Sequence, residues 1–567
     1  MKEYILEFNP HSTREDKRFI FTSNSEFSDT FHKFHSEKYF FFIEGKIHNS
    51  NFLKKRFNLE GKESFGVLIE LLADHENIQE LLHGAFIIIF YDFRRNRLKI
   101  IRDSQGLKLA YFTKVNNGFY FSNAIENLIN IQKVTLNKEM VKNFLGWDLT
   151  DLNNTFFNEI KKISSSTVLN IGYKDSSIRK YNISPDLFTK YSDDYVNKFE
   201  EVFFKSVSDS LEKGKKNAVM LSGGIDSSAV SVAVKQTSAQ QISSYSGNFS
   251  HVCDPGNMIL DEKKYQENII SYTKFDHTYI ELENISPFLA LKESLDIFKQ
   301  PIIIPNLYML GHIAKKAQKD DVKVLLDGSD GDTIISHGYE VLYGYFKKLN
   351  IVKLIKEIRL YSKLNQRNFN KTILMFLKHF IKKALLINTN KTNHTLLKKN
   401  FFKDSYLVNK NKIYDSHKAK LNSPLQIVGK EYNYILFRHF DIEIRSPFYD
   451  ERIINFCLNM PDIYKFNLGI TRSILRKFLS KYIGKDHAYR VTKADLSSGL
   501  LANITSDDIA LVRKEFNNIN ENILDLISVD KIENIFNEWE SSQKLDQEQV
   551  INLMIFYNLN IFLKRYF

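Results

Sequence analysis

The chain has few cysteines and no long apolar run. Cys253 and Cys457 are its only cysteines, which excludes a disulfide framework and a metal site built from four thiolates. So few thiols are typical of a protein in a reducing compartment. The most apolar stretch, residues 373–387, is interrupted by lysines, and the first residues lack the apolar core of a signal peptide. These absences predict a cytoplasmic protein with no membrane span.

Composition and charge leave several kinds of partner open. Hydrophobic residues make up 43% and charged residues 26% of 567 positions, as in globular proteins, and this length predicts two or more domains. Lysine and arginine number 79 against 67 acidic residues, a net charge of +12. A basic balance suits an anionic partner such as a nucleotide, a nucleic acid or a membrane surface. Lysine-rich solvated faces explain it at least as well.

The first part of the chain, residues 1–185, has a β-rich pattern. Short apolar or alternating runs separated by turn residues predict an α+β layered domain. Its expected strands are residues 39–49, 84–92, 97–103, 109–123 and 166–173, and its expected helix is 63–82.

The second domain, expected at residues 190–567, begins with strands that alternate with helices. This rhythm predicts an α/β domain with a parallel sheet, followed by C-terminal helices. Expected strands are residues 217–221, 241–249, 276–283 and 322–327, and expected helices are 261–274, 286–299 and 307–320. In the region 340–420, rich in lysine and asparagine, we expect helices and a mobile stretch at 388–395.

The loop after the first of these strands, "LSGGIDSS" at 221–228, is typical of a phosphate site. Backbone N–H groups at the start of the following helix attract anions, and Gly223 and Gly224 let the backbone approach them closely. Asp226 suits this place if it holds Mg²⁺ that the phosphate also binds. The lysine of the Walker motif is absent. A tight glycine turn with a serine N-cap is the structural alternative.

A second loop, "LLDGSDGDT" at 325–333, follows the strand at 322–327. Asp327, Asp330 and Asp332 repel one another unless a cation or hydrogen bonds compensate. A polar turn is the simplest explanation. Mg²⁺ shared with the loop at 221–228 would also explain the cluster.

Together the two loops resemble those of the asparagine synthetase family, within the ATP pyrophosphatase superfamily. That family carries Ser-Gly-Gly-x-Asp-Ser and later Gly-x-Gly-Gly-Asp-Glu, so Asp332 matches its metal- and pyrophosphate-binding aspartate, whereas Thr333 replaces its glutamate. Four further segments match the family: "DEKKYQENI" (261–269), "EIRSPFYDERIINFCLNMP" (443–461), "GITRSILRKFL" (469–479) and "YRVTKADLSSGL" (489–500).

The resemblance implies ATP and Mg²⁺ as cofactors and assigns residues to them. The expected ATP and pyrophosphate ligands are Leu221, Ser222, Gly223, Gly224, Asp226, Ser227, Ser228, Ser246 and Gly328. Asp226 and Asp332 are the expected metal ligands, and Asp226, Asp332 and Lys493 are expected to be catalytic. Arg472 and Arg490 are weaker candidates of the same kind.

Residues 83–112 resemble the core of the family's glutaminase domain, which implies an Ntn-hydrolase-like α+β sandwich. In glutamine-using members a cysteine directly after the initiator methionine is the nucleophile, and Lys2 stands there in this chain. The family's oxyanion-hole Asn-Gly pair appears as Glu44-Gly45. Because a carboxylate repels a developing oxyanion, we expect no glutamine hydrolysis.

The resemblance implies an AMP-forming ligase that adenylates a carboxylate and joins it to an amine. Of the members without the cysteine, the loops are most similar to lasso-peptide macrolactam synthetases, which close a ring within a precursor peptide. Such an enzyme has a peptide substrate and can have a leader-peptide-processing partner. The alternatives are an asparagine synthetase that uses aspartate and ammonia, and a non-catalytic scaffold. A nucleic-acid partner is not expected, since a tRNA-modifying pyrophosphatase would not carry the glutaminase-like domain.

Overall fold

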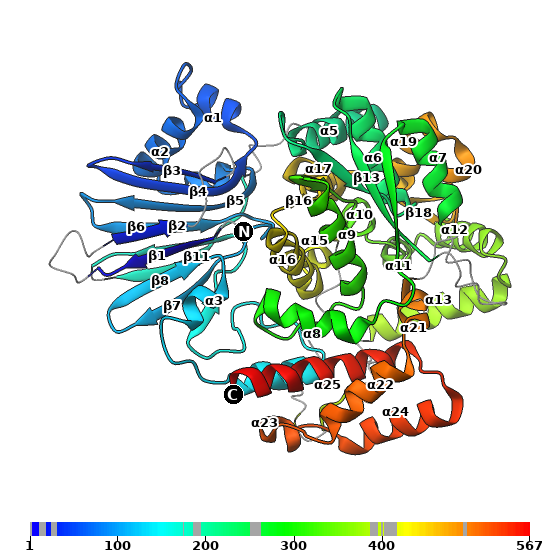
Figure 1. Ribbon diagram of the computed structural model, residues 1–567. Coiled ribbons are helices and arrows are strands. Elements are labelled where there is room, and N and C mark those ends of the chain that lie inside the picture. Colours follow the sequence, from blue (N-terminus) through cyan, green and yellow to red (C-terminus); the bar gives the residue numbers. More distant parts are fainter. Residues whose placement is uncertain are drawn as a thin grey trace.

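A computed structural model describes residues 3–10, 19–23, 31–173, 175–184, 194–249, 262–385, 395–398, 401, 417–491 and 496–567, without the side chains of 496–498. A β-rich domain, blue to cyan in Figure 1, lies beside an α/β domain, and a group of C-terminal helices lies below the latter. These helices are α22 (Ser506–Phe516), α24 (Val529–Ser542) and α25 (Gln547–Tyr566).

The N-terminal domain contains two antiparallel sheets. One has the order β2 (Phe19–Ser23), β1 (Tyr4–Phe8), β8 (Gly118–Ser122), β7 (Tyr111–Val115), β9 (Ile160–Lys162). The other has the order β11 (Ser176–Lys180), β10 (Thr167–Ile171), β6 (Arg97–Arg102), β5 (Gly84–Asp92), β4 (Tyr39–Ile47), β3 (Phe31–His35).

The sequence of strand β4 is apolar at consecutive positions because both faces of the strand are buried. Phe40 and Phe42 pack in the core between the two sheets, whereas Phe41 and Ile43 face the core beneath helix α2 (Ser64–Asp74). Successive side chains of a strand point to opposite faces, so both faces of β4 are buried. This arrangement confirms the predicted Ntn-hydrolase-like α+β sandwich.

The helix predicted at 63–82 is shorter than expected. Helix α2 ends at Asp74 because His75 adopts an extended conformation (φ −120, ψ 116), and a short 3-10 turn follows at Ile78–Leu81. The strands predicted at 39–49, 84–92, 97–103 and 166–173 correspond to β4, β5, β6 and β10. The predicted strand at 109–123 is the hairpin β7–β8, which turns at Asn116 with φ +54.

The second domain is built on a five-stranded parallel sheet, which confirms the predicted α/β architecture. Its order is β14 (Asp276–Glu281), β13 (Ser243–Asn248), β12 (Asn217–Met220), β15 (Val324–Leu326), β16 (Glu443–Arg445), and every neighbouring pair is parallel. The strand order reverses between β12 and β15, and ligands of such sheets bind at the carboxyl ends of the strands at this point. β16 was not predicted to be a strand.

Both faces of this sheet are buried. Val219, Val324 and Leu326 lie in a core with helices α5 (Tyr195–Ser210), α6 (Ile225–Thr237) and α19 (Ser473–Ile483). Ala218 and Leu325 lie in a second core, which includes helices α8 (Pro287–Phe298), α9 (Leu307–Lys319), α16 (Pro424–His439) and α25.

The second core also joins the domains. The ring of Phe562 in α25 lies 5.4 Å from that of Phe156 and 5.8 Å from that of Phe157, both of which precede β9. One of the apolar cores therefore contains residues of both domains.

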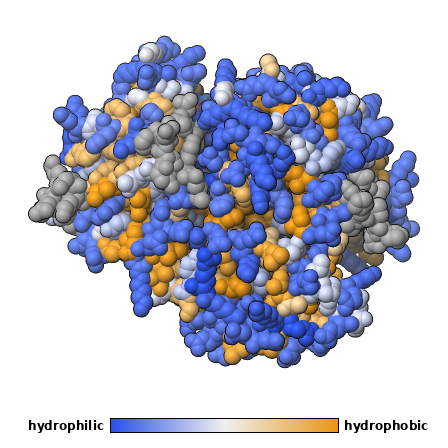
Figure 2. All heavy atoms as spheres, in the orientation of Figure 1, coloured by the Kyte–Doolittle hydropathy of each residue, from blue (hydrophilic) through white to orange (hydrophobic). Residues whose placement is uncertain are grey.

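The lysine-rich region forms helices α11 (Glu340–Lys347), α12 (Ile351–Leu364) and α13 (Phe369–Ala384). The stretch expected to be mobile, 388–395, lies outside the described residues except for Thr395. Within the described chain, no helix combines the length and apolarity needed to cross a bilayer. The face in Figure 2 is largely polar, and its hydrophobic side chains form separate patches.

Candidate nucleotide site and domain interface

The loops after β12 and β15 meet at the switch point of the parallel sheet. A Cβ atom on Gly328 would lie 2.6 Å from the backbone nitrogen of Ser227. A Cβ atom on Gly331 would lie 2.8 Å from the carboxyl carbon of Asp226. Only glycine allows this approach, so the two loops that the sequence singles out form one surface.

The first loop turns sharply into helix α6. Gly223 has φ +79, a conformation that favours glycine, and a Cβ atom there would lie 3.0 Å from a carboxylate oxygen of Glu262. The helix begins at Ile225, which places Asp226 in its first turn. The exposed Ser222 hydroxyl lies 2.9 Å from that of the buried Ser227.

Leu221, Ser246 and Ser228 are buried and engaged within the protein. The N–H group of Leu221 donates to the carbonyl of Tyr245 at 2.8 Å, and the Ser246 hydroxyl donates to the carbonyl of Leu221. The Ser228 hydroxyl lies 3.1 Å from Nε2 of His487. These three residues hold the strand end and the helix start in place.

The three aspartates of the second loop have different environments. Asp327 is 2% exposed and accepts hydrogen bonds from Ser329 and Ser446, and burial raises its pKa. Asp330 accepts a hydrogen bond from the Tyr449 hydroxyl, and its pKa is also raised by burial. Asp332 is exposed in the first turn of helix α10 (Gly331–Ile335). Of the three, Asp332 is the carboxylate that faces solvent.

Arginines approach this surface from the C-terminal part of the chain. Nη1 of Arg472 lies 2.5 Å from Oδ2 of Asp226, so a guanidinium stands beside the carboxylate predicted to bind a cation. Arg490 pairs with Glu262 at 2.6 Å and stacks over the Tyr265 ring at 3.9 Å. Within the described chain, Nε and Nη1 of Arg490 are buried and make no hydrogen bond.

The donor set fits an ATP–Mg²⁺ complex. Carboxylates at Asp226 and Asp332 are the oxygen ligands that Mg²⁺ prefers. The Ser222 hydroxyl, the start of α6 and the unsatisfied nitrogens of Arg490 are suited to phosphate oxygens. Lys493 lies outside the described residues.

His487 is a residue of this surface that the sequence did not reveal. It is 3% exposed, and burial lowers its pKa to about 4, so it is neutral at pH 7. Its Nδ1 lies 3.1 Å from the amide nitrogen of Asn268, a donor, which assigns the proton to Nε2 and makes Ser228 the acceptor. No local pattern marks His487, because its partners are 219 and 259 residues away.

At the domain interface, Glu44 contacts the α/β domain. Its carboxyl group is 5% exposed, and burial raises its pKa. It accepts hydrogen bonds from the Tyr434 hydroxyl of α16 at 2.5 Å and from Nδ2 of Asn123 at 3.1 Å. The following Gly45 has φ +106, and a Cβ atom there would lie 2.0 Å from the carbonyl oxygen of Ala85. At the position where the family is expected to have its oxyanion hole, this chain thus has a carboxyl group that forms a hydrogen bond between the two domains.

A buried ion cluster connects the same domains. Both terminal nitrogens of Arg102 lie 3.1 Å from Oε1 of Glu431 in α16, and Nζ of Lys162 lies 2.9 Å from Oε2. Arg102 also donates to the carbonyls of three residues of its own domain, Gly106, Lys108 and Ile163.

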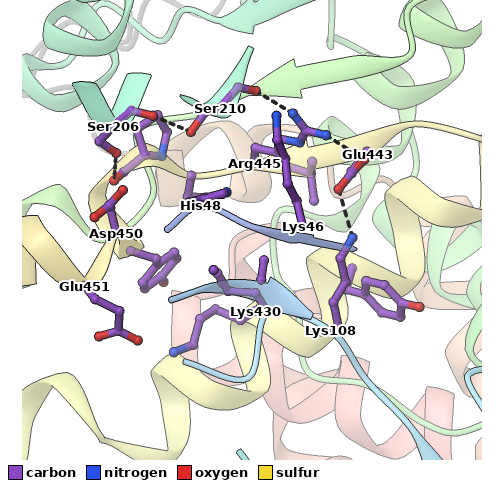
Figure 3. A pocket seen from close by; sticks show the side chains of 18 of the residues that line it. Lys46, His48, Lys108, Ser206, Ser210, Lys430, Glu443, Arg445, Asp450 and Glu451 are labelled. Carbon is purple, nitrogen blue, oxygen red and sulfur yellow. Dashed lines mark hydrogen bonds and ion pairs between the residues drawn. The ribbon is translucent and has the colours of Figure 1, made fainter. Parts of the chain in front are cut away.

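Beside this interface lies a cavity of about 70 Å³, shown in Figure 3. On one side, Glu443 accepts from Nζ of Lys108 at 3.0 Å and from Nη2 of Arg445 at 2.9 Å. Asp450 and Glu451 line the opposite side.

Comparison with known proteins gives two family matches. A model described as asparagine synthase matches residues 198–564, and one described as a glutamine amidotransferase domain matches residues 32–182.

The chain is also similar in sequence to asparagine synthetases of Bacillus subtilis. The chain is 23% identical over 488 residues to asparagine synthetase (glutamine-hydrolyzing) 1 of Bacillus subtilis (strain 168), which covers 78% of this chain and 73% of that protein. It is 24% identical over 204 residues to asparagine synthetase (glutamine-hydrolyzing) 3 of the same strain, which covers 34% of this chain and 33% of that protein.

Among solved structures, glutamine phosphoribosylpyrophosphate amidotransferase from B. subtilis, complexed with ADP and GMP, matches with a TM-score of 0.23 and 7% identity, over 50% of this chain and 85% of that chain.

Because the asparagine synthase model spans more than half of the residues, the chain belongs to the asparagine synthase family, whose members are ATP-dependent ligases that form C–N bonds.

Proposed function

We propose that this ligase adenylates a substrate carboxylate and transfers the acyl group to an amine that does not come from glutamine. A carboxylate oxygen attacks the α-phosphorus of ATP, and pyrophosphate leaves. The amine nitrogen then attacks the acyl carbon, loses a proton and releases AMP. The observation that carries the proposal is Glu44, a buried carboxyl group at the position of the family's oxyanion hole.

The residues at the sheet's switch point have distinct roles in this proposal. The loop from Ser222 to Ser228 would bind the leaving pyrophosphate, with Arg490 as an additional donor. Asp226 and Asp332 would hold Mg²⁺, which offsets the charge that develops on pyrophosphate. Arg472 would leave Asp226 when the cation binds. Lys493 is proposed to stabilise the later, amide-forming transition state.

For the substrate, we propose a precursor peptide that is closed to a macrolactam, as in lasso-peptide synthetases. A domain that does not release ammonia suits a reaction whose amine belongs to the substrate itself. The second candidate is the formation of asparagine from aspartate and ammonia, since the curated relatives are asparagine synthetases.

An exchange assay of labelled pyrophosphate into ATP tests adenylation directly. We expect exchange with short peptides that have an N-terminal glycine and an acidic residue further along, and loss of one water from the peptide by mass spectrometry. Exchange with aspartate alone would favour asparagine synthesis. Glutamate released from glutamine would contradict the inactive first domain.

Asp226→Asn should abolish exchange, because the amide removes the charge that the metal requires. Asp321→Asn is a matched control, since the Asp321 side chain is 85% exposed and pairs only with a surface lysine at 3.1 Å in the described chain. Full exchange by Asp226→Asn, or no exchange by the native protein with any of these substrates, would refute the proposal.

A further inference from the structure

Two histidines and an aspartate meet at the interface between the domains. His48 follows β4, His83 precedes β5, and Asp450 caps helix α17 (Glu451–Asn459). One ligand atom of each lies within 4.8 Å of the others, and Nε2 of His83 lies 3.1 Å from Oδ1 of Asp450. The side chains of His83 and Asp450 are 6% and 3% exposed. Figure 3 places His48 and Asp450 on the side of the cavity away from the Lys108–Glu443 pair.

We propose that His48, His83 and Asp450 bind a Zn²⁺ ion. Two imidazoles and one carboxylate form a ligand set typical of zinc, which is tetrahedral and often has three protein ligands and one water. The adjoining cavity of about 70 Å³ has room for that water. Mg²⁺ prefers oxygen ligands, so this site differs in kind from the one at Asp226 and Asp332.

The surroundings hold the ligands in place. The backbone N–H group of His48 donates to the carbonyl of His83 at 2.8 Å, and the two rings lie 5.3 Å apart in an edge-to-face arrangement. The backbone N–H and Nε of Arg452 donate to Oδ1 of Asp450 at 2.8 and 2.9 Å. Such outer hydrogen bonds orient metal-binding carboxylates.

The charge of Arg452 does not exclude a cation. Nη2 of Arg452 lies 2.5 Å from Asp450 and 2.8 Å from Asp209, so two carboxylates share one guanidinium. Lys205 also pairs with Asp209 at 2.7 Å, so with neutral imidazoles this group has no net charge before zinc binds. A divalent ion would therefore enter a site without net positive charge.

The ligands come from both domains, so zinc would join them. His48 and His83 belong to the N-terminal domain, whereas Asp450 belongs to the α/β domain. Metal that binds only the folded protein stabilises it by mass action. This inference does not depend on the proposed reaction, and its test uses neither ATP nor a substrate.

The test measures zinc bound to the full chain after treatment with a chelator and titration with ZnCl₂. We expect one Zn²⁺ per chain by mass spectrometry of the metal, and a rise in the thermal midpoint on zinc addition. The double variant His48→Gln/His83→Gln should lose both. His379→Gln is the matched control, because that side chain is 60% exposed.

Cobalt(II) gives a second measurement that needs no variant. Native protein loaded with Co²⁺ should show the strong visible absorption of a tetrahedral ion with nitrogen and oxygen ligands. Absence of tightly bound zinc, or equal zinc binding by the double variant, would overturn the site. A His–Asp–Arg hydrogen-bond network without a metal would then explain the cluster.

Discussion

Gly331 lies at one of the two close contacts between the strand-end loops. Replacing it by alanine would place a methyl group 2.8 Å from the Asp226 carboxyl carbon, so the loops must separate. We expect Gly331→Ala to reduce pyrophosphate exchange by tenfold or more, which corresponds to about 1.4 kcal/mol in the barrier.

Gly344→Ala is the control for that substitution. Gly344 lies inside α11, and a Cβ atom there would meet nothing within 4 Å. It should leave exchange unchanged and stabilise the protein by about 0.5–1 kcal/mol in urea unfolding. Equal exchange by Gly331→Ala and Gly344→Ala would contradict the tight contact.

The hydrogen bond between Tyr434 and Glu44 makes a second prediction for single residues. Tyr434→Phe leaves a buried carboxyl group with one fewer donor, so we expect a loss of about 1–3 kcal/mol in the free energy of unfolding. Glu44→Gln keeps an acceptor for Tyr434 and removes the cost of burying charge, and should lose less. Urea unfolding of both variants measures these losses. A larger loss in the free energy of unfolding for Glu44→Gln than for Tyr434→Phe would refute this account.

The sequence could identify residues of the two adjoining loops where the signal is local. Gly223, Gly224 and Asp226 stand in one short segment, and the resemblance extends to Asp332. His487 could not be found in this way, because its partners are distant in sequence. The hydrogen bond from Ser246 to Leu221 was not predictable either, since it depends on how two strands align.

Helix α16 of the α/β domain contacts the N-terminal domain through a buried ion cluster. Its Glu431 side chain is 4% exposed and is paired with Arg102, which is fully buried, and with Lys162. Because Glu431→Gln leaves two cations without their counter-charge, we expect a loss of about 3–5 kcal/mol in the free energy of unfolding. Glu70→Gln is the control, since its exposed pair with Lys62 should be worth about 0–1 kcal/mol. Similar losses for both variants in urea unfolding would refute the importance of the cluster.

Elements with strong patterns were predicted well, and short ones were not. β5 was predicted with its observed bounds because nine consecutive residues carry an apolar strand pattern. β16 has only three residues, too few for any period, and depends on pairing with β15. The helix at 63–82 was predicted too long because apolar residues continue past His75, where the backbone becomes extended.

At the scale of the whole molecule, buried histidines predict acid sensitivity. Burial is the largest cause that lowers the pKa to about 3 in His48 and His417, and to about 4 in His277, His337 and His487. Histidine in an unfolded chain has a pKa of about 6.5, so below that pH the unfolded state binds more protons. The free energy of unfolding should therefore fall as pH falls from about 6.5 to 4.

Buried carboxyl groups with raised pKa values act in the opposite direction. Burial raises the pKa of Glu451 to about 7 and also raises the pKa values of Glu44, Asp327 and Asp330, so these groups stabilise the folded protein as pH falls and offset part of the loss. Urea unfolding of the metal-free protein at pH 7 and pH 5 measures the balance, with His417→Gln expected to reduce the pH dependence. Equal stability at both pH values would contradict the prediction.

The bond between Glu44 and Tyr434 also bears on ammonia production. On the proposed assignment of Glu44 to the oxyanion-hole position, a variant with a nucleophilic thiol would still present an acid where negative charge develops on a carbonyl oxygen. Exchanging that acid for asparagine would shorten the side chain and withdraw it from a tyrosine in the other domain. On the proposed assignment, ammonia production by this chain would therefore require coordinated changes on both sides of the interface.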